Sequence, residues 1–199
     1  MCSSDLGVVL AAGLSRRMGQ AKLLLALEGK PVVRHAVERV LAGGVERVVV
    51  VVPPEFETLR AALEGLPIQW AVNLNPSAGQ GVSIAAGIDA LPSGTSAALI
   101  ALADQPVLPS AVIPELLAVF GRTGMPIVAP RYREGQGNPV LFGVQVFSEL
   151  RALSGDRGAR SVIEKDPGRV AWVDFDLSMP ADVDTPEDYD RLRSPDQAV

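Results

Sequence analysis

A short apolar run near the N-terminus ends in a loop whose residues suit phosphate binding. Lys22 and two arginines before it supply charge-assisted donors, while Gly13 and Gly19 tolerate backbone angles that other residues resist. Exposed N–H groups in a turn of small residues form a concavity that binds anions. We therefore interpret residues 10–22 as a nucleotide-binding loop. The alternative is a solvated basic connection between a strand and a helix.

The loop differs from two common phosphate-binding patterns. A Walker A loop needs Gly-Lys-Ser/Thr in succession, whereas Gln20 and Ala21 separate Gly19 from Lys22. Ser15 stands where the dinucleotide-binding fingerprint has its second glycine. The predicted nucleotide site is therefore of another kind.

A carboxylate follows a second apolar run and is placed to bind a metal. Asp104 comes directly after residues 97–103, and beside a phosphate loop we expect it to hold Mg²⁺, which prefers a few carboxylates plus phosphate oxygens. The alternative is an aspartate that caps a turn or helix. The candidates for a second ligand are four acidic residues toward the C-terminus: Asp174, Asp176, Asp182 and Asp184. Asp184 could instead belong to a helix start, because Thr185 and Pro186 follow it.

Alternating strands and helices must position these residues. The apolar runs 6–10, 47–52 and 97–103 are typical of parallel strands covered on both faces. Shorter strands are expected at 68–72, 126–129, 139–142 and 170–173, and helices at 31–41, 55–63, 82–91, 109–120, 144–153, 159–165 and from Thr185. This order predicts an α/β fold with a doubly wound, mostly parallel sheet. Ligands of such sheets bind at the carboxyl ends of strands, where the loop and Asp104 both lie.

Length and composition limit the class of protein. With 199 residues, 48% of them hydrophobic, we expect one domain over 1–199, with residues 1–5 and 194–199 disordered. The net charge of −5 argues against non-specific binding to nucleic acid, and no apolar run approaches the ~20 residues that cross a membrane. We find no secretory signal. The single cysteine, Cys2, excludes an internal disulfide framework and a cysteine-rich zinc site, so we expect a cytoplasmic protein. His35, the only histidine, lies in a predicted helix and is expected to be structural.

Taken together, the motifs resemble those of the MobA-like nucleotidyltransferases of molybdenum cofactor biosynthesis, and most closely their molybdenum cofactor cytidylyltransferase branch. Residues 10–22 match the loop of that branch, LAAGxSxRMGxxK, at every specified position. The other matches follow in order along the chain: Asn73, Asn75, Gly81 and Ser83; Asp104 to Pro106; the glycine-containing segment 135–139; GDRGAR at 155–160; and DVDTPEDY at 182–189. The resemblance thus covers nearly the whole chain.

The resemblance implies a fold, a reaction and a set of site residues. The fold is Rossmann-like, of the nucleotide-diphospho-sugar transferase type, and the reaction transfers CMP from CTP to the phosphate of a molybdopterin-type cofactor, releasing pyrophosphate. Arg17, Lys22 and Asp104 are the implied catalytic residues, and Asp104 with Asp184 would hold Mg²⁺. The implied nucleotide-binding residues are Leu10, Ala11, Ala12, Gly13, Ser15, Arg17, Lys22, Asn73, Gly81, Ser83 and Asp104. The residues implied to face the cofactor are Gly137, Asn138, Pro139, Asp156, Arg157 and Arg160.

Other functions share parts of this pattern. In the family, Ala-Ala-Gly in the first loop accompanies cytosine, whereas guanylyltransferase relatives tend to have Ala-Gly-Gly, so Ala12 favours CTP. The alternatives are a transferase that uses another nucleotide or a sugar or polyol phosphate, and a non-catalytic chaperone that binds the finished cofactor. A molybdenum hydroxylase is a candidate recipient of the product. Neither nucleic acid nor a membrane is an expected partner.

Overall fold

The computed structural model describes residues 5–13 and 21–193, and every structural statement below concerns those residues. Its centre is an eight-stranded sheet with the order β10-β7-β9-β6-β1-β4-β5, and β8 pairs with β7 beside this path. The strands are β1 Asp5–Leu10, β4 Arg47–Val52, β5 Ile68–Val72, β6 Ala97–Leu102, β7 Ile127–Tyr132, β8 Gly135–Gln136, β9 Val140–Gly143 and β10 Val170–Asp174; β2 Ala26–Leu27 and β3 Lys30–Pro31 form a separate hairpin.

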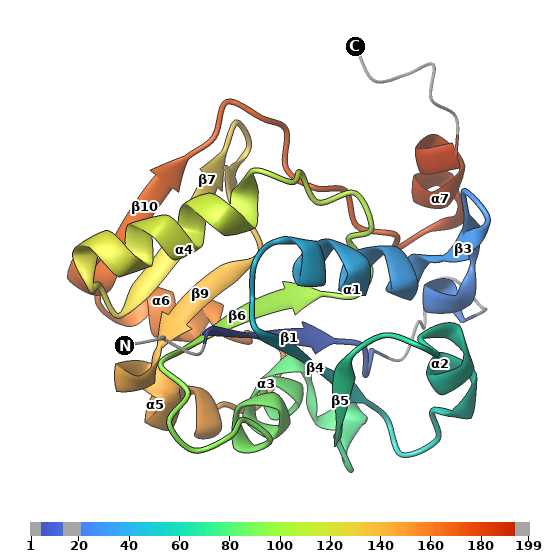
Figure 1. Ribbon diagram of the computed structural model, residues 1–199, viewed down its shortest axis with the longest axis horizontal. Coiled ribbons are helices and arrows are strands. Elements are labelled where there is room, and N and C mark those ends of the chain that lie inside the picture. The colour runs from blue at the N-terminus through green and yellow to red at the C-terminus, as the bar shows by residue number, and fades with distance from the viewer. Residues whose placement is uncertain (1–4, 14–20, 194–199) are drawn as a thin grey trace.

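Helices cover both faces of the sheet, as Figure 1 shows. The α-helices are α1 Val32–Ala42, α2 Glu57–Ala62, α3 Gln80–Asp89, α4 Val112–Thr123, α5 Phe147–Arg151, α6 Arg160–Lys165 and α7 Pro186–Arg193; the 3-10 turns are η1 Lys22–Leu24, η2 Pro76–Ala78, η3 Val144–Val146 and η4 Pro167–Arg169. Apolar residues of α1, α2 and α4 pack on one face, and those of α3, α5 and α6 on the other. The doubly wound, Rossmann-like α/β fold is thereby confirmed.

The direction of the strands creates a switch point in the middle of the sheet. β1 pairs in parallel with both β4 and β6, so the chain builds the sheet outward from β1 in two directions. β9 is the antiparallel strand between β6 and β7. The carboxyl ends of β1 and β6 therefore lie side by side, which is where open α/β sheets bind ligands.

The strand residues alternate between the two apolar layers. Val8 belongs to the layer under α3 and Val9 to the layer under α1, because successive side chains of a strand point to opposite faces. Gly87 lets α3 approach β1 closely: a Cβ atom at this position would lie 2.5 Å from a methyl carbon of Val8. This close contact packs the C-terminal half of α3 against the middle of β1.

Several boundaries differ from the expectation. α4 begins at Val112 rather than Pro109. Pro114 gives the reason, because proline fits the first turn of a helix but would block a hydrogen bond in the interior of a helix that began at Pro109. Asp5, expected among disordered residues, is the first residue of β1, where its carboxylate accepts a hydrogen bond from Ser96 Oγ.

Two further segments were mispredicted. The helix expected at 144–153 is divided into η3 and α5, and residues 135–136, where no strand was expected, form β8, which pairs with β7. α3 starts at Gln80, two residues before the expected position, because Gly79 at φ 98° turns the chain sharply into the helix. Among the described residues, the helices are all too short or too polar to cross a bilayer.

Candidate active site

A cleft opens where β1 and β6 end, because Leu10 and Leu102, the last residues of these strands, line it. It consists of two adjoining hollows, a smaller one of about 350 Å³ and a larger one of about 490 Å³. Four residues line both hollows, at the junction between them: Leu10, Gln80, Leu102 and Asp156. The strand ends predicted to carry the chemistry thus meet at one place.

The smaller hollow contains much of the predicted nucleotide site. Its lining includes Leu10, Ala12, Gly13, Ser83 and Asp104. Ala11, also implied to bind the nucleotide, donates its backbone N–H to Val51 O at 2.8 Å. Ser15 and Arg17 lie outside the described residues.

Lys22 is the centre of an ionic cluster beside the smaller hollow. Its Nζ donates to Asp104 Oδ2 at 2.6 Å and to Asp184 Oδ1 at 2.7 Å. The Lys22 side chain is only 11% exposed. The residues come from η1, from the end of β6 and from the segment before α7, so the cluster ties three distant parts of the chain together.

Backbone contacts fix the position of the two carboxylates. The N–H of Val183 donates to Asp104 O at 2.9 Å, which holds the segment before α7 against the end of β6. Val183 is fully buried, and its neighbours Asp182 and Asp184 lie on either side of it. Asp184 meets Lys22, whereas Asp182 lines the larger hollow. Of the four candidate second ligands, Asp184 is the one whose carboxylate accepts a hydrogen bond from the same ammonium as Asp104.

The charges of the cluster shift the titration of its members. Burial would lower the pKa of Lys22, but the charges and hydrogen bonds of Asp104 and Asp184 outweigh burial and raise it, so the ammonium is charged at neutral pH. Asp182 keeps part of its surface open to solvent, yet shielding of its carboxyl from water, and then the charge of Asp104, raise the pKa of Asp182 to about 6. The cleft thus concentrates negative charge around one cation.

A helix cap orients Asp184. Asp188 Oδ2 accepts hydrogen bonds from Thr185 N and Thr185 Oγ1, both at 2.9 Å, and from Asp184 N at 3.3 Å. Thr185 Oγ1 in turn accepts from Asp188 N at 3.2 Å. This reciprocal pattern is a capping box, and it confirms the helix start predicted at Thr185. The cap fixes the backbone at the residue whose carboxylate contacts Lys22.

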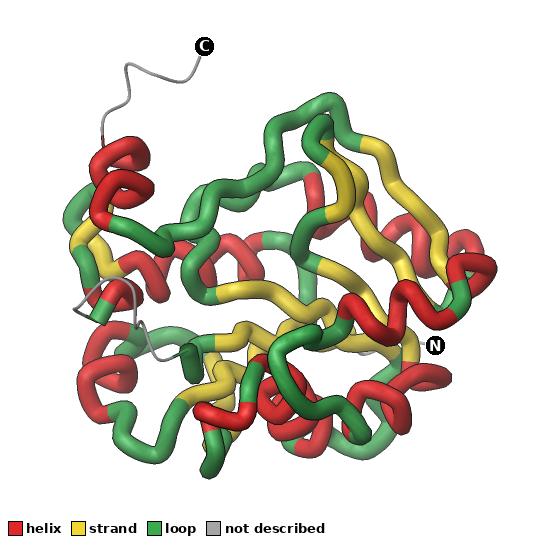
Figure 2. The backbone as a smooth tube through the Cα atoms, turned by 180° about the vertical axis from the view of Figure 1, so that it is seen from behind, coloured by secondary structure: helices red, strands yellow, loops and turns green. Residues whose placement is uncertain are grey.

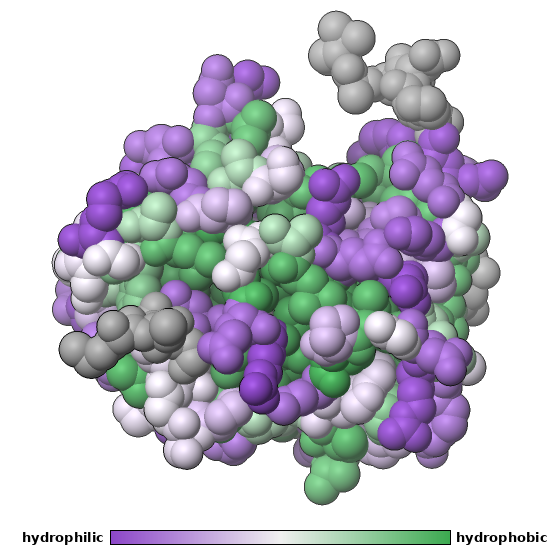
Figure 3. Space-filling view, viewed as in Figure 1, coloured by the Kyte–Doolittle hydropathy of each residue, from purple (hydrophilic) through white to green (hydrophobic). Residues whose placement is uncertain are grey.

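Helix α7 is held by few, specific contacts. Hydrophilic residues cover it in Figure 3, and none of its residues, all of which are described, is buried. Tyr189 Oη donates to Ala26 O at 2.5 Å, which joins α7 to the β2–β3 hairpin just after η1. Figures 1 and 2 show α7 beside this hairpin at one edge of the molecule. Asp184 and Tyr189 therefore fasten the C-terminal segment to both ends of the stretch 22–26.

Asn73 and Gly81 support the smaller hollow from behind. Neither is among the described residues that line it. Asn73 is buried, and its Nδ2 donates to Ser83 Oγ at 2.9 Å. Gly81 N donates to Gly155 O at 2.9 Å, and a Cβ atom at Gly81 would lie 2.8 Å from the backbone of Ser154. These residues position Ser83 and the turn at 154–156, a support that the sequence pattern alone did not distinguish from direct binding.

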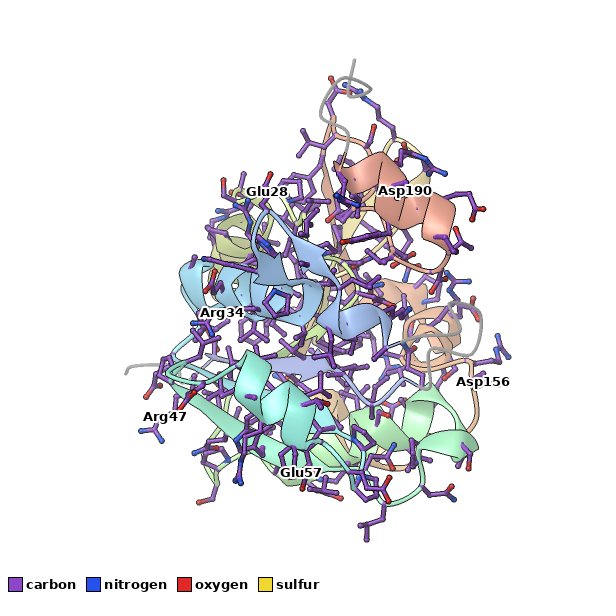
Figure 4. The ribbon with its side chains drawn as sticks, turned by 90° about the vertical axis from the view of Figure 1, so that its right-hand side faces the viewer. Glu28, Arg34, Arg47, Glu57, Asp156 and Asp190 are labelled. Carbon is purple, nitrogen blue, oxygen red and sulfur yellow. The ribbon has the colours of Figure 1, made fainter. Side chains whose placement is uncertain are left out.

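The larger hollow contains most of the residues predicted to face a cofactor. Gly137, Asn138, Asp156, Arg157 and Arg160 line it, whereas Pro139 is not among the described residues of its lining. Arg157 donates to Glu164 Oε2 at 2.6 Å. Asp156, labelled at the right-hand edge of the molecule in Figure 4, lines both hollows.

Sequence reasoning missed three amide side chains of the larger hollow, those of Gln80, Gln105 and Gln136. Gln105 is buried and donates to Pro180 O at 3.3 Å. Its place in the turn after Asp104 was the available signal. The apolar floor of the hollow is formed by Ile84, Ile100, Val140, Phe142 and Ile163.

The carboxylate pair suits Mg²⁺. Asp104 and Asp184 each place an oxygen within 2.7 Å of a single cation, the Lys22 ammonium. In the described ranges 5–13 and 21–193 there is no group of three or more His, Cys, Asp or Glu side chains placed to hold a metal. Mg²⁺ is typically bound by one or two carboxylates together with substrate phosphates rather than by an all-protein cage. The donor set therefore fits a metal that arrives with a phosphate ligand.

Comparisons with known proteins find a family and relatives that match most of the chain. Residues 7–170 match the family model described as the MobA-like NTP transferase domain. The chain is 32% identical to the purine catabolism protein PucB of Bacillus subtilis, over 94% of this chain and 95% of that protein. It is 33% identical to nicotine blue oxidoreductase of Paenarthrobacter nicotinovorans, with the same two coverages.

Solved structures show the same fold. The crystal structure of Rv0371c from Mycobacterium tuberculosis aligns with a TM-score of 0.87 and 27% identity, covering 97% of this chain and 99% of that one. A structure of Rv0371c in complex with manganese aligns with a TM-score of 0.79, covering 95% and 97% of the two chains.

Proposed function

The chain belongs to the MobA-like NTP transferase family, and we propose that it transfers CMP from CTP to the terminal phosphate of a molybdopterin-type molybdenum cofactor, releasing pyrophosphate. The observation that carries this proposal is the cluster of Lys22, Asp104 and Asp184 beside the smaller hollow. It offers one cation and two carboxylates at the switch point of the sheet. Nucleotidyl transfer can use this combination, because its transition state is stabilised mainly by positioning and charge neutralisation.

The smaller hollow receives CTP in this proposal. Its triphosphate lies against Gly13 and Lys22, with Arg17 as a further donor predicted from the sequence. Ser83, held by buried Asn73, bounds the base and ribose side. Ala12 lines the same hollow, and the family pattern links its methyl group to cytosine preference.

Asp104 and Asp184 would hold Mg²⁺, which neutralises phosphate charge when it is bound. The protein's own part is to fix both carboxylates through the Val183–Asp104 backbone hydrogen bond and the cap at Asp188. Lys22 carries a positive charge toward the phosphates that become pyrophosphate.

The larger hollow receives the cofactor. Its apolar floor and amide side chains suit a flat heterocycle with polar edges, and Arg160 and Arg157 suit a phosphate group. An oxygen of the cofactor phosphate attacks the α-phosphorus of CTP from this side. The new P–O bond forms as the bond to the β-phosphate oxygen breaks, and pyrophosphate leaves. The junction of the hollows is where the two substrates would meet.

Redox chemistry is a second candidate, because one relative is named as an oxidoreductase. A chaperone that only binds the cofactor is another alternative. A further one is a transferase that uses another nucleotide, or a sugar or polyol phosphate as the acceptor. The ionic cluster favours nucleotidyl transfer over the first two, since neither hydride transfer nor simple binding requires paired carboxylates around a cation.

A ligand panel separates these functions. CTP, GTP, ATP and UTP are each added with Mg²⁺, and the midpoint of thermal unfolding is measured, since a ligand that binds only the folded state raises it. Pyrophosphate is then measured with molybdopterin cofactor or with sugar and polyol phosphates as acceptors. We expect the largest shift with CTP and pyrophosphate release only with the cofactor. NAD(P)H oxidation without pyrophosphate release would instead establish the redox alternative.

A further inference from the structure

In the structure, the two carboxylates proposed to hold a metal already hold a cation of the protein itself. Lys22 Nζ contacts Asp104 Oδ2 at 2.6 Å and Asp184 Oδ1 at 2.7 Å. These are short, charge-assisted distances, and the Lys22 side chain is largely withdrawn from solvent. The ammonium thus bridges one oxygen of each carboxylate.

We propose that Lys22 is an internal placeholder that keeps a lone divalent cation out of the site, so that the metal enters only together with a nucleotide triphosphate. The triphosphate supplies what the exchange needs: oxygens for the metal and a new anionic partner for the displaced ammonium. The nucleotide part of this inference rests on the proposed function, whereas the competition between Lys22 and a metal does not.

Both size and charge prevent the Lys22 ammonium and a divalent metal ion from occupying the site at the same time. A Mg²⁺ ion approaches its oxygen ligands to about 2.1 Å, inside the distances that Lys22 keeps from the same oxygens. An ammonium left between them would also repel the metal. Lys22 can withdraw without unfolding its surroundings, because its backbone is fixed in η1 while its four-carbon stem is flexible.

Competition of this kind weakens metal binding by a calculable amount. The apparent dissociation constant equals the intrinsic one divided by the fraction of molecules whose site is open. If Lys22 occupies the site in about nine molecules of ten, a lone metal binds about tenfold more weakly than the carboxylates alone allow. A lysine that only contacts phosphate, without competing, predicts no such weakening.

Removal of the ammonium tests the proposal without any nucleotide. Binding of Mn²⁺ alone is measured by electron paramagnetic resonance for the wild type, for Lys22→Met and for the control Lys30→Met, which removes a charge paired with Glu38 on the surface. We expect Lys22→Met to bind Mn²⁺ about tenfold more tightly and Lys30→Met to match the wild type. Unchanged or weaker binding by Lys22→Met would overturn the placeholder.

Ionic strength distinguishes occupation of the site from a general field effect. The screening length falls from about 8 Å at 0.15 M salt to about 3 Å at 1 M. A contact at 2.6 Å is therefore screened little, whereas a distant charge is screened strongly. If Lys22→Met still binds Mn²⁺ more tightly than the wild type at high salt, the placeholder is supported. If this difference in affinity disappears at high salt, the placeholder is contradicted. If Lys22→Met folds poorly, Lys22→Gln replaces it. The rise of the unfolding midpoint on addition of Mn²⁺ is then compared between Lys22→Gln and the wild type.

In the presence of nucleotide, Lys22→Met should change the binding affinity in the opposite direction. With CTP present, Lys22→Met should bind Mn²⁺–CTP at least tenfold more weakly than the wild type, because the triphosphate loses its ammonium partner. Equal or tighter Mn²⁺–CTP binding by the variant would overturn the exchange. Failure of the wild type to bind CTP at all would refute the proposed function and the exchange, while the metal-only result would still decide the competition.

Discussion

The two hollows of the cleft are built in opposite ways. The smaller one is lined mostly by small and polar residues, and at one side Asp104 joins it to the ionic cluster with Lys22 and Asp184. The larger one has an apolar floor and a rim of amides and arginines, of which Arg157 is paired at the surface. A hollow of small residues beside an ionic cluster suits a triphosphate, which every nucleoside triphosphate shares, whereas an apolar floor with polar edges suits selection of one acceptor.

The strongest test of this contrast is to remove a charge from the smaller hollow. We expect Asp104→Asn to lower turnover by about a hundredfold to a thousandfold, because one carboxylate of the proposed metal site is lost. Glu115→Gln, at an exposed ion pair on α4, is the matched control. The measurement is pyrophosphate release as a function of Mg²⁺ concentration; an unchanged metal titration would show that Asp104 is no ligand.

The next test removes a residue that only orients the ionic site. Asp188→Ala should weaken Mn²⁺–CTP binding by about tenfold to a hundredfold, since supporting hydrogen bonds tune metal ligands by this amount. Asp188→Asn, which keeps an acceptor oxygen, should lose less. Asp190→Ala, at an exposed position on the same helix (Figure 4), should behave as the wild type. If Asp188→Ala and Asp190→Ala weaken Mn²⁺–CTP binding equally, the loss of affinity comes from a general disturbance of α7 and not from the cap.

A substitution in the larger hollow should weaken binding of the acceptor but not of CTP. Arg160→Ala is expected to raise the KM for the cofactor about tenfold, through loss of one charge-assisted hydrogen bond, and to leave CTP binding unchanged. Arg122→Ala, on the far helix α4, is the control. A parallel loss of CTP affinity would mean that the two hollows are not separate sites.

The smallest expected effect concerns the support beneath the larger hollow. Glu149 accepts hydrogen bonds from Arg169 and Lys165, which hold the pKa of Glu149 at about 2, below its ordinary 4.5. A lowered carboxyl pKa stabilises the folded protein above pH 4.5, and this contribution is lost as pH falls from 4.5 toward 2. Glu149→Gln should therefore cost on the order of 1–2 kcal/mol at neutral pH and much less near pH 2–3. Urea unfolding at both pH values measures this; a cost independent of pH would point to packing instead.

The sequence predicted the parts of the site that have local patterns. Asp104 follows an apolar strand, Lys22 ends a loop with a recognisable spacing, and Thr185 starts a capping box, so each has a signal within a few residues. The choice between Asp182 and Asp184 had none, because it depends on how buried Val183 docks against the end of β6. A contact across 162 residues, such as Lys22 to Asp184, becomes visible only in the fold.

The same reasoning explains which fold details were missed. The strongly apolar strands were predicted within a residue or so, since burial on both faces dictates their composition. The start of α4 was missed because the prediction weighed Pro109 and overlooked Pro114. Gln105 was missed as a lining residue because its place in the turn after Asp104 was a signal of position only, and did not say whether its amide is buried or on the surface.

The central claim is that the smaller hollow delivers the α-phosphate of CTP to an acceptor in the larger one. The most direct measurement follows radioactive phosphorus in a single turnover with CTP, Mg²⁺ and molybdopterin cofactor. We predict that a label at the α-phosphate passes to the cofactor and a label at the γ-phosphate passes to pyrophosphate, both in equal amounts. If CTP binds but the α-label stays in CTP or appears as free CMP, the account of this protein as a cytidylyltransferase is contradicted.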